Sequence, residues 1–247
     1  MKLSVIILVA LFSATLGYAQ DASSPAATSP SSTTTRSAPP GAEPNLPGTL
    51  VMDFGFNFLA GAPDNMGLRF FKSKGVAFSY LYDMPIGESK FSFHPGLGVG
   101  FESYAFDQNV TVQYPLGADS ASVVALDANE YQNVIKSKLM THYVDVPLEF
   151  RFYTKQNQRG LMVALGGKVG YLFSSYTKVK YETQGERQVE KLRQQRNFNL
   201  NRLRYGASAR LGFRGIHLHG QYMFSNLFKD EGPTGNNWRV GLSIALF

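Results

Sequence analysis

The chain has 247 residues and 44% hydrophobic content, with 24 glycines, 13 tyrosines and 19 phenylalanines. This composition favours strands and turns over helices, and the length fits one large β domain. Because there is no cysteine, disulfides, thiol nucleophiles and a lipid-anchoring cysteine are excluded. The formal net charge is +6, but Lys and Arg are spread along the chain, which argues against nucleic acid as a partner.

Residues 1–19 predict a cleavable export signal. Lys2 precedes a short apolar run. The small residues Gly17 and Ala19 occupy positions −3 and −1 relative to cleavage before Gln20. We therefore expect export, with cleavage near Ala19/Gln20.

Residues 20–48 are rich in Ser, Thr, Ala and Pro and have little apolar surface to bury, which predicts a disordered spacer. After the leader, the chain has no stretch of about eighteen consecutive apolar residues, the length that a membrane-spanning helix needs. If residues 49–247 meet a membrane, they must do so as strands.

Apolar and polar residues alternate with the period of a β-strand in eight windows after residue 49. The fourth window, "VDVPLEFRF", shows the alternation without a break. The windows cover residues 50–58, 76–84, 91–101, 144–152, 161–171, 203–213, 216–224 and 238–246.

The connections between the windows are alternately long and short. The short ones are at 87–89, 154–159 and 214–215, and each of the others has about a dozen residues or more. In an up-and-down barrel this places all long loops at one end, as in outer-membrane barrels. We therefore predict an all-β fold: an eight-stranded antiparallel up-and-down transmembrane β-barrel with long extracellular loops and short periplasmic turns.

In each window the polar positions alternate with the apolar ones, and we call these two sets the polar and the apolar parity. The polar parity is rich in glycine and small residues. Inside a narrow eight-stranded bore, small residues make room for long charged side chains, so this parity should face inward. We interpret the inward charges as an ion-pair network that plugs the lumen, with a selective pore lining as the alternative. They are Asp53, Asp83, Glu102, Asp145, Glu149, Arg151, Lys168, Arg202, Arg204, Arg210 and Arg239.

The apolar parity should then face lipid. Its aromatic residues lie mostly near strand ends, as two interfacial girdles require. Tyr82, Phe91, Phe152 and Phe213 lie beside short turns, and Phe101, Tyr171, Phe224 and Trp238 lie beside long loops.

The connection 178–199 is basic, and we expect a loop with a helical turn or two. It is interpreted either as a solvated loop or as a contact for lipopolysaccharide phosphates or a partner protein. Its basic residues are Lys178, Lys180, Arg187, Lys191, Arg193 and Arg196. The triplet "DSA" around Ser120 resembles a short O-glycosylation signal, and we expect a chance match.

The histidines do not predict an enzyme. His94, His217 and His219 fall near the periplasmic end of the lumen, and the parity of His142 points outward. No serine and acid are placed convincingly beside His142 to use it as a base. We expect no catalytic residues, no cofactor and no metal.

Four segments, "YVDVPLEFRF", "RYGASARLGF", "HPGLGVGF" and "YMFSNLFKD", resemble the PorT-like outer-membrane β-barrel family over residues 49–247. The resemblance implies a barrel in the outer membrane of a Gram-negative bacterium. It also suggests a structural or interaction role, accessory to a secretion or surface-assembly system, as some PorT-like members are in type IX secretion. A small-solute, porin-like channel is the alternative. Co-purification of a partner would favour the first function, and ion conductance the second.

Overall fold

A computed structural model describes residues 48–107, 110–113, 122–125, 133–155, 160–183, 186–192, 197–229 and 233–246. The predicted leader, the spacer up to residue 47, Ser120, Arg193 and Arg196 lie outside the described residues. Within the described ranges, no helix has both the length and the apolar character needed to cross a membrane.

Seven of the eight alternating windows lie within a strand of their own, and the second runs past the end of its strand to Met84. These strands are β1 (Gly48–Ala60), β2 (Lys74–Tyr82), β4 (Phe91–Ala105), β7 (Val134–Tyr153), β8 (Leu161–Thr183), β10 (Leu203–Phe213), β11 (Ile216–Asn226) and β12 (Asn236–Leu246). The shorter elements are β3 (Met84–Pro85), β5 (Val110–Gln113), β6 (Ser122–Ala125), β9 (Glu186–Leu192) and the 3-10 turns η2 (Asp64–Met66), η3 (Phe70–Lys72) and η4 (Asn197–Asn199).

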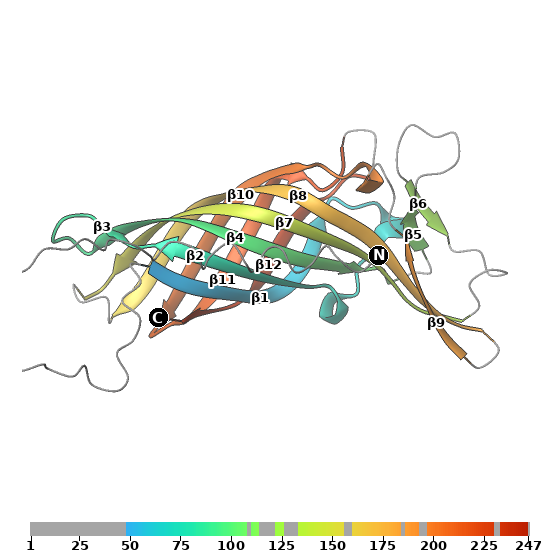
Figure 1. The fold of residues 1–247 in the computed structure, drawn as a ribbon, viewed down its shortest axis with the longest axis horizontal. Helices are drawn as coiled ribbons and strands as arrows, with labels where there is room; N and C mark the ends of the chain where they lie inside the picture. Colours follow the sequence, from blue (N-terminus) through green and yellow to red (C-terminus); the bar gives the residue numbers. More distant parts are fainter. Residues whose placement is uncertain are drawn as a thin grey trace, which may run out of the picture. The chain divides into compact units, whose positions relative to one another are not determined.

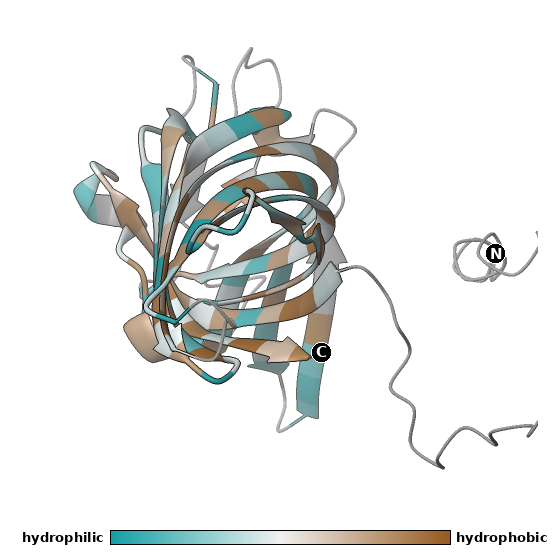
Figure 2. Cartoon of the chain, turned by 90° about the vertical axis from the view of Figure 1, so that its left-hand side faces the viewer, coloured by the Kyte–Doolittle hydropathy of each residue, from teal (hydrophilic) through white to brown (hydrophobic). Residues whose placement is uncertain are grey.

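One antiparallel sheet of ten strands dominates the described part of the chain. Its order is β10-β11-β12-β1-β2-β4-β7-β8-β9, and β8 also pairs with β10, which closes the sheet into a ring (Figures 1 and 2). The sheet has two more strands than the eight predicted, because β3 pairs with β4 beyond the end of β2 and β9 folds back on β8.

The ring buries its polar parity and exposes its apolar one. In β7 every second residue from Ser137 to Arg151 is buried, whereas Leu148 is 42% exposed and Phe150 is 59% exposed. The bands of opposite hydropathy in Figure 2 follow this alternation along the strands. A soluble barrel would do the reverse, so the outer surface of this ring needs an apolar environment.

The two ends of the ring differ. The connections β3–β4, β7–β8 and β10–β11 are short, and we call this the short-turn end. At the opposite, long-loop end, β5 pairs with β6, and β9 continues the sheet beyond the ring (Figure 1).

The helical turn predicted within 178–199 is wrong for most of this segment. β8 continues to Thr183 and pairs with β9, starting at Thr183 and Glu186. On its other side the same part of β8 pairs with residues 134–138 of β7. Because pairing on both sides satisfies the backbone of β8, tertiary structure overrides the helical propensity of the charged residues.

A buried hydrophobic cluster fills the long-loop end of the ring, and we call it the cap cluster. Inward-facing strand residues meet residues from the connections in it. It comprises Met66, Tyr104, Phe106, Val110, Val112, Leu139, Tyr143, Leu172, Phe198, Leu200, Leu227 and Phe228. The interior is therefore polar along most of its length and apolar at this end.

Leu148, near the middle of the apolar face of β7, tests whether this face meets lipid. Leu148→Arg should lower the free energy of unfolding by about 2–4 kcal/mol, because the bilayer midplane solvates a charge poorly. Leu148→Ile keeps volume and polarity and should cost less than about 1.5 kcal/mol. Urea unfolding from lipid vesicles measures both variants, and equal losses would mean that this face does not contact lipid.

Candidate functional site

Glu102 lies at the centre of an interior ion-pair cluster. Its carboxylate is fully buried and accepts hydrogen bonds from Arg204 at 2.7 Å and from Arg239 at 2.6 Å. Arg204 also forms a two-nitrogen contact with Asp145, with N–O distances of 2.8 to 3.1 Å. Glu102, Asp145, Arg204 and Arg239 come from β4, β7, β10 and β12, so this Glu102 cluster connects four strands across the interior.

The Glu102 cluster is joined to the cap cluster. The Tyr104 hydroxyl donates to Glu102 Oε2 at 2.5 Å, and the Arg204 guanidinium lies 3.6 Å from the centre of the Tyr143 ring. Tyr104 and Tyr143 both belong to the cap cluster. The buried charges are thus held on one side by other charges and on the other by aromatic rings, which restricts water access.

A second cluster lies closer to the short-turn end, around Arg210 of β10. Arg210 pairs with Asp53 of β1 at 2.7 Å and with Glu149 of β7. Arg151 pairs with Glu149 at 3.3 Å, and the Ser243 hydroxyl donates to Asp53 at 2.5 Å. This Arg210 cluster also spans the interior from wall to wall.

Glycines on neighbouring strands make room for these side chains. Arg204 and Asp145 both pair with Gly170 in register, on opposite sides of β8. A Cβ atom at Gly170 would overlap both side chains, and one at Gly75 would overlap the Arg239 guanidinium. The glycine content of the inward parity is therefore a requirement of the ion pairs across the lumen.

Most of the predicted lumen residues lie together in the interior. Lys168 lies 3.8 Å from Asp145 and donates to Gln221 at 3.0 Å. The buried ones are Asp53, Glu102, Asp145, Glu149, Arg151, Lys168, Arg204, Arg210 and Arg239. Asp83 is only half-buried, and Arg202 is exposed in a bend before β10, because the chain has left the sheet there.

Sequence reasoning missed a hydrogen-bonded relay at the short-turn end. His94 lies 2.7 Å from Asp83 through Nδ1 and 2.6 Å from the Ser92 hydroxyl through Nε2. Because a carboxylate only accepts, His94 donates to Asp83 and accepts from Ser92. The two-residue spacing of Ser92 and His94 places both on one face of β4, and this pattern was available in the sequence.

The relay has the connectivity of a serine nucleophile and its base, but Ser92 is only 2% exposed. Burial raises the pKa of Asp83, but the hydrogen bond and charge of His94, the charge of Arg151 and the hydrogen bond from Thr49 together outweigh burial and hold that pKa below its ordinary value. Thr49 also donates to Asp83, at 3.1 Å. The relay therefore ties β1 and β4 to the end of β2.

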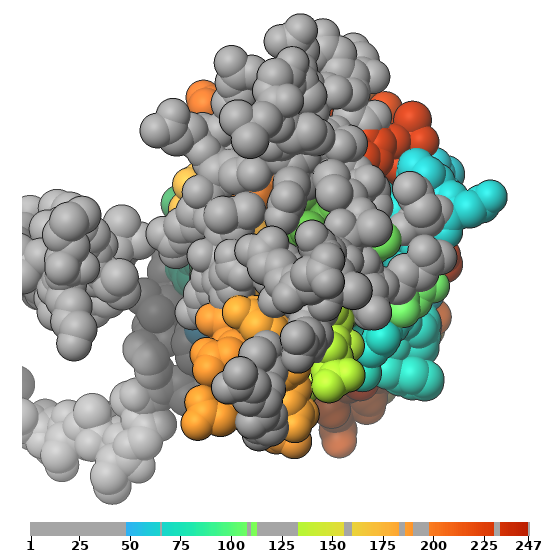
Figure 3. Space-filling model, turned by 90° about the vertical axis from the view of Figure 1, so that its right-hand side faces the viewer, coloured from blue at the N-terminus to red at the C-terminus, as the bar shows by residue number. Residues whose placement is uncertain are grey.

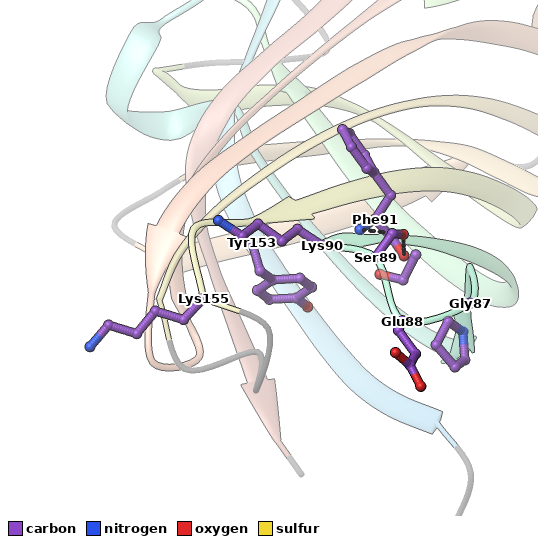
Figure 4. A pocket seen from close by; sticks show the side chains of 9 residues that line it. Gly87, Glu88, Ser89, Lys90, Phe91, Tyr153 and Lys155 are labelled. Atoms are coloured by element: carbon purple, nitrogen blue, oxygen red, sulfur yellow. Dashed lines mark hydrogen bonds between the residues drawn. The ribbon is translucent and has the colours of Figure 1, made fainter.

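The described interior offers little free volume. Beside Glu102 and Arg204 there is a cavity of about 10 Å³, barely the room that one water molecule needs. A cavity of about 310 Å³ at the short-turn end, with Arg151 and His217 in its lining, is the mouth of the lumen. Another, of about 320 Å³, lies between two turns and is lined by Tyr153, Lys155 and the residues of Gly87–Phe91 (Figure 4). The described residues contain no group of three potential metal ligands.

The predicted basic patch lies partly on strands. Lys178 and Lys180 belong to β8, and Arg187 and Lys191 belong to β9, whereas the rest lie outside the described residues.

Comparison with known proteins gives one family and two solved structures. The family model for the outer membrane protein beta-barrel domain matches residues 48–246. The crystal structure of Ail, the attachment invasion locus protein of Yersinia pestis, in complex with the heparin analogue sucrose octasulfate is similar at 14% identity, with a TM-score of 0.37, covering 81% of this chain and 97% of that one. The structure of Ail in a phospholipid bilayer nanodisc is similar at 16% identity, with a TM-score of 0.35, covering 81% and 99%. No curated protein matches the chain significantly.

Two arginines two residues apart provide a matched test of the Glu102 cluster. Arg204→Met should lower the free energy of unfolding by about 3–5 kcal/mol, because Glu102 and Asp145 lose their shared partner while still buried. Arg202→Met, at an exposed position, should change it by less than about 0.5 kcal/mol. Urea unfolding in detergent measures both, and similar small losses would show that the buried ion pairs contribute little.

Proposed function

The chain belongs to the family of outer membrane protein beta-barrel domains, and we propose that it is a closed, non-catalytic barrel with a structural or interaction role in that membrane. In this proposal the eight strands of the closed ring span the bilayer. The long-loop end faces the outside, and the short-turn end faces the periplasm. The exposed apolar parity and its aromatic residues near both strand ends support the insertion.

The observation that carries the proposal is the filled interior. The Arg210 cluster, the Glu102 cluster and the cap cluster follow one another toward the long-loop end. Buried charges that are paired this closely stiffen a barrel, whereas a pore needs charges that remain hydrated. The small-solute channel is the weaker alternative for this reason.

The interaction role rests on the long-loop end and on the PorT-like resemblance of four segments. Beyond the ring, β9 extends β8, and β5 pairs with β6 in a sheet of their own (Figure 1). Such extensions provide side chains and backbone edges for a protein partner. We propose that this partner belongs to a secretion or surface-assembly complex of the type IX kind, and that the chain is exported with cleavage near Ala19/Gln20.

A planar-bilayer recording combined with unfolding tests the closed barrel. The parent chain should give no single-channel steps. Glu149→Gln should also give none, and it should lower the free energy of unfolding by about 3–5 kcal/mol because Arg210 and Arg151 lose their shared carboxylate. A porin recorded under the same conditions is the positive control. Ion-selective steps that shift toward anions in Glu149→Gln, at unchanged stability, would establish the channel instead.

Affinity purification from native membranes tests the interaction role. We expect a protein partner to co-purify with the parent chain in mild detergent. A variant without the β8–β9 extension beyond residue 178 should retain the ring and lose that partner. Retention of the partner by this variant would exclude the extension as the contact surface.

A further inference from the structure

Four lysines form a compact group on the outer surface of the ring, at the long-loop ends of β7 and β8. Lys136 is directly opposite Lys180 in register, and Lys138 is directly opposite Lys178. All four are half-exposed, and they alternate with buried residues on both strands, so they face away from the interior. We call them the lysine quartet.

The lysine quartet has little compensating negative charge among the residues that the structure describes. Like charges directly opposite each other on one face of a sheet are destabilising. In the described part of the chain no salt bridge joins any of the four to a carboxylate. Glu182 lies two residues beyond Lys180, but its partner in register is Arg187.

Lys138 lies beyond the part of β7 that would span the membrane. Its ammonium donates to the Lys72 carbonyl at 2.7 Å and to the Ser103 hydroxyl at 2.9 Å, which leaves a third donor. Burial and the positive charges of Lys136, Lys74 and Lys178 lower its pKa to about 8. A group of cations this close together, with no carboxylate of the described residues in a salt bridge to it, is arranged for an anion.

Aromatic rings just below the quartet locate it relative to the membrane. His142 contacts Phe101 at 5.2 Å, Phe173 at 5.9 Å and Tyr176 at 5.7 Å between ring centres. Such rings lie at the boundary between hydrocarbon and headgroups. Lys178 is two residues beyond Tyr176, which is about 7 Å along the strand and about 5 Å along the membrane normal at a tilt of about 45°.

Lys178 and its register partner Lys138 fall within the polar layer, which is about 5–7 Å thick on each side of a bilayer, and Lys180 and Lys136 lie about 5 Å higher, just above it. The quartet therefore spans the outer edge of the headgroup layer. Its side chains point sideways into this layer. Figure 3 shows the orange atoms of the β8–β9 extension beside the yellow-green start of β7, at the edge of the long-loop end. A ligand in the plane of the membrane reaches this surface more directly than one approaching along the barrel axis.

We propose that the lysine quartet binds the phosphate groups of lipopolysaccharide in the outer leaflet. The inference rests on the proposed function, because the quartet meets that leaflet only if the long-loop end faces outside. The shared chemistry is a phosphate. Lipid-borne phosphate is favoured over free phosphate by the depth and direction of the lysines.

The test is a calorimetric titration of purified lipopolysaccharide into the full mature chain in detergent micelles at low ionic strength. Lys136→Gln combined with Lys178→Gln removes one lysine from each opposed pair. We expect binding about 30-fold weaker than for the parent, from about 1 kcal/mol for each surface lysine. Lys90→Gln combined with Lys155→Gln removes the same charge at the short-turn end and should bind as the parent does.

Three further titrations identify the source of the phosphate. Lipopolysaccharide stripped of its phosphates should bind far more weakly than the intact molecule. Phosphatidylglycerol vesicles and inorganic phosphate should compete poorly. Affinity should also fall from about pH 7 to about pH 9, because Lys138 loses its proton in the free protein.

Unchanged affinity in the Lys136/Lys178 variant would overturn the proposal, as would equal binding of phosphate-free lipopolysaccharide. Equal competition by phosphatidylglycerol or inorganic phosphate would assign the site to that phosphate source instead. Tighter binding of a sulfated polysaccharide through the same lysines would make the ligand a soluble polymer. The titration depends on neither orientation nor conductance, so a failure to bind lipopolysaccharide would leave the closed barrel intact. Conversely, single-channel steps would refute the closed barrel without affecting the binding result.

The variant also provides a check on folding. Removing one lysine from each opposed pair relieves repulsion, so the unliganded variant should melt at the same temperature as the parent or higher. Lipopolysaccharide should raise the melting temperature of the parent only. A variant that melts lower without ligand but gains as much from lipopolysaccharide as the parent would contradict the site.

Discussion

Pairing of buried charge is the constraint on which the rest of the structure depends. A ring with an apolar exterior turns its polar side chains inward, and an unpaired charge there is costly. Arg204 meets this constraint by bridging Glu102 and Asp145, and Arg210 does so by bridging Asp53 and Glu149. Each bridge crosses the interior, so the ion pairs both fill the bore and hold opposite walls at a fixed distance.

Other features follow from these bridges. Gly75 and Gly170 are needed because a side chain there would displace Arg239 or Arg204. The cap cluster shields the Glu102 cluster from water at the long-loop end, where Tyr104 and Tyr143 contact both. Because the interior is filled, binding is left to the outer surface and the long-loop end. The proposed protein partner and the lipopolysaccharide phosphates would both bind there.

The strands β7 and β8 pass through three environments from their middle to the long-loop end. Their central residues, such as Leu148 and Leu165, are exposed and apolar, and aromatic residues follow toward the long-loop end. The lysine quartet comes next, and the inward parity changes over the same distance from Glu149 and Asp145 to Tyr143 and Leu139. Both faces of these strands therefore change chemistry with depth, as a barrel in an asymmetric membrane requires.

Much of this architecture could be predicted from residue alternation. The sixth window begins and ends at the same residues as β10, and glycines and charges in the windows predict which parity faces inward. The pairing of Arg204 with Glu102 could not be predicted, because it joins residues 102 positions apart and depends on strand register.

Three local features also could not be predicted from residue alternation. Arg202 has the inward parity but lies in a bend outside the sheet. In the paired segments of β8 and β9 the charges mask the strand pattern, so the sequence predicts a loop with helical turns there. The cap cluster draws on η2, η4 and β5, and no periodic pattern connects these short elements.

The absence of cysteine allows one direct test of the filled interior. Ser79, on the inward face of β2, is 4% exposed, and Ser89 is exposed in the β3–β4 turn. Each is replaced by cysteine in turn, and the rate of modification by a charged, water-soluble thiol reagent is measured on the folded chain. We expect rapid modification of Ser89→Cys and at least about a hundredfold slower modification of Ser79→Cys, since reaction there requires local opening. Comparable rates at the two positions would mean that water fills the lumen and would contradict the closed barrel.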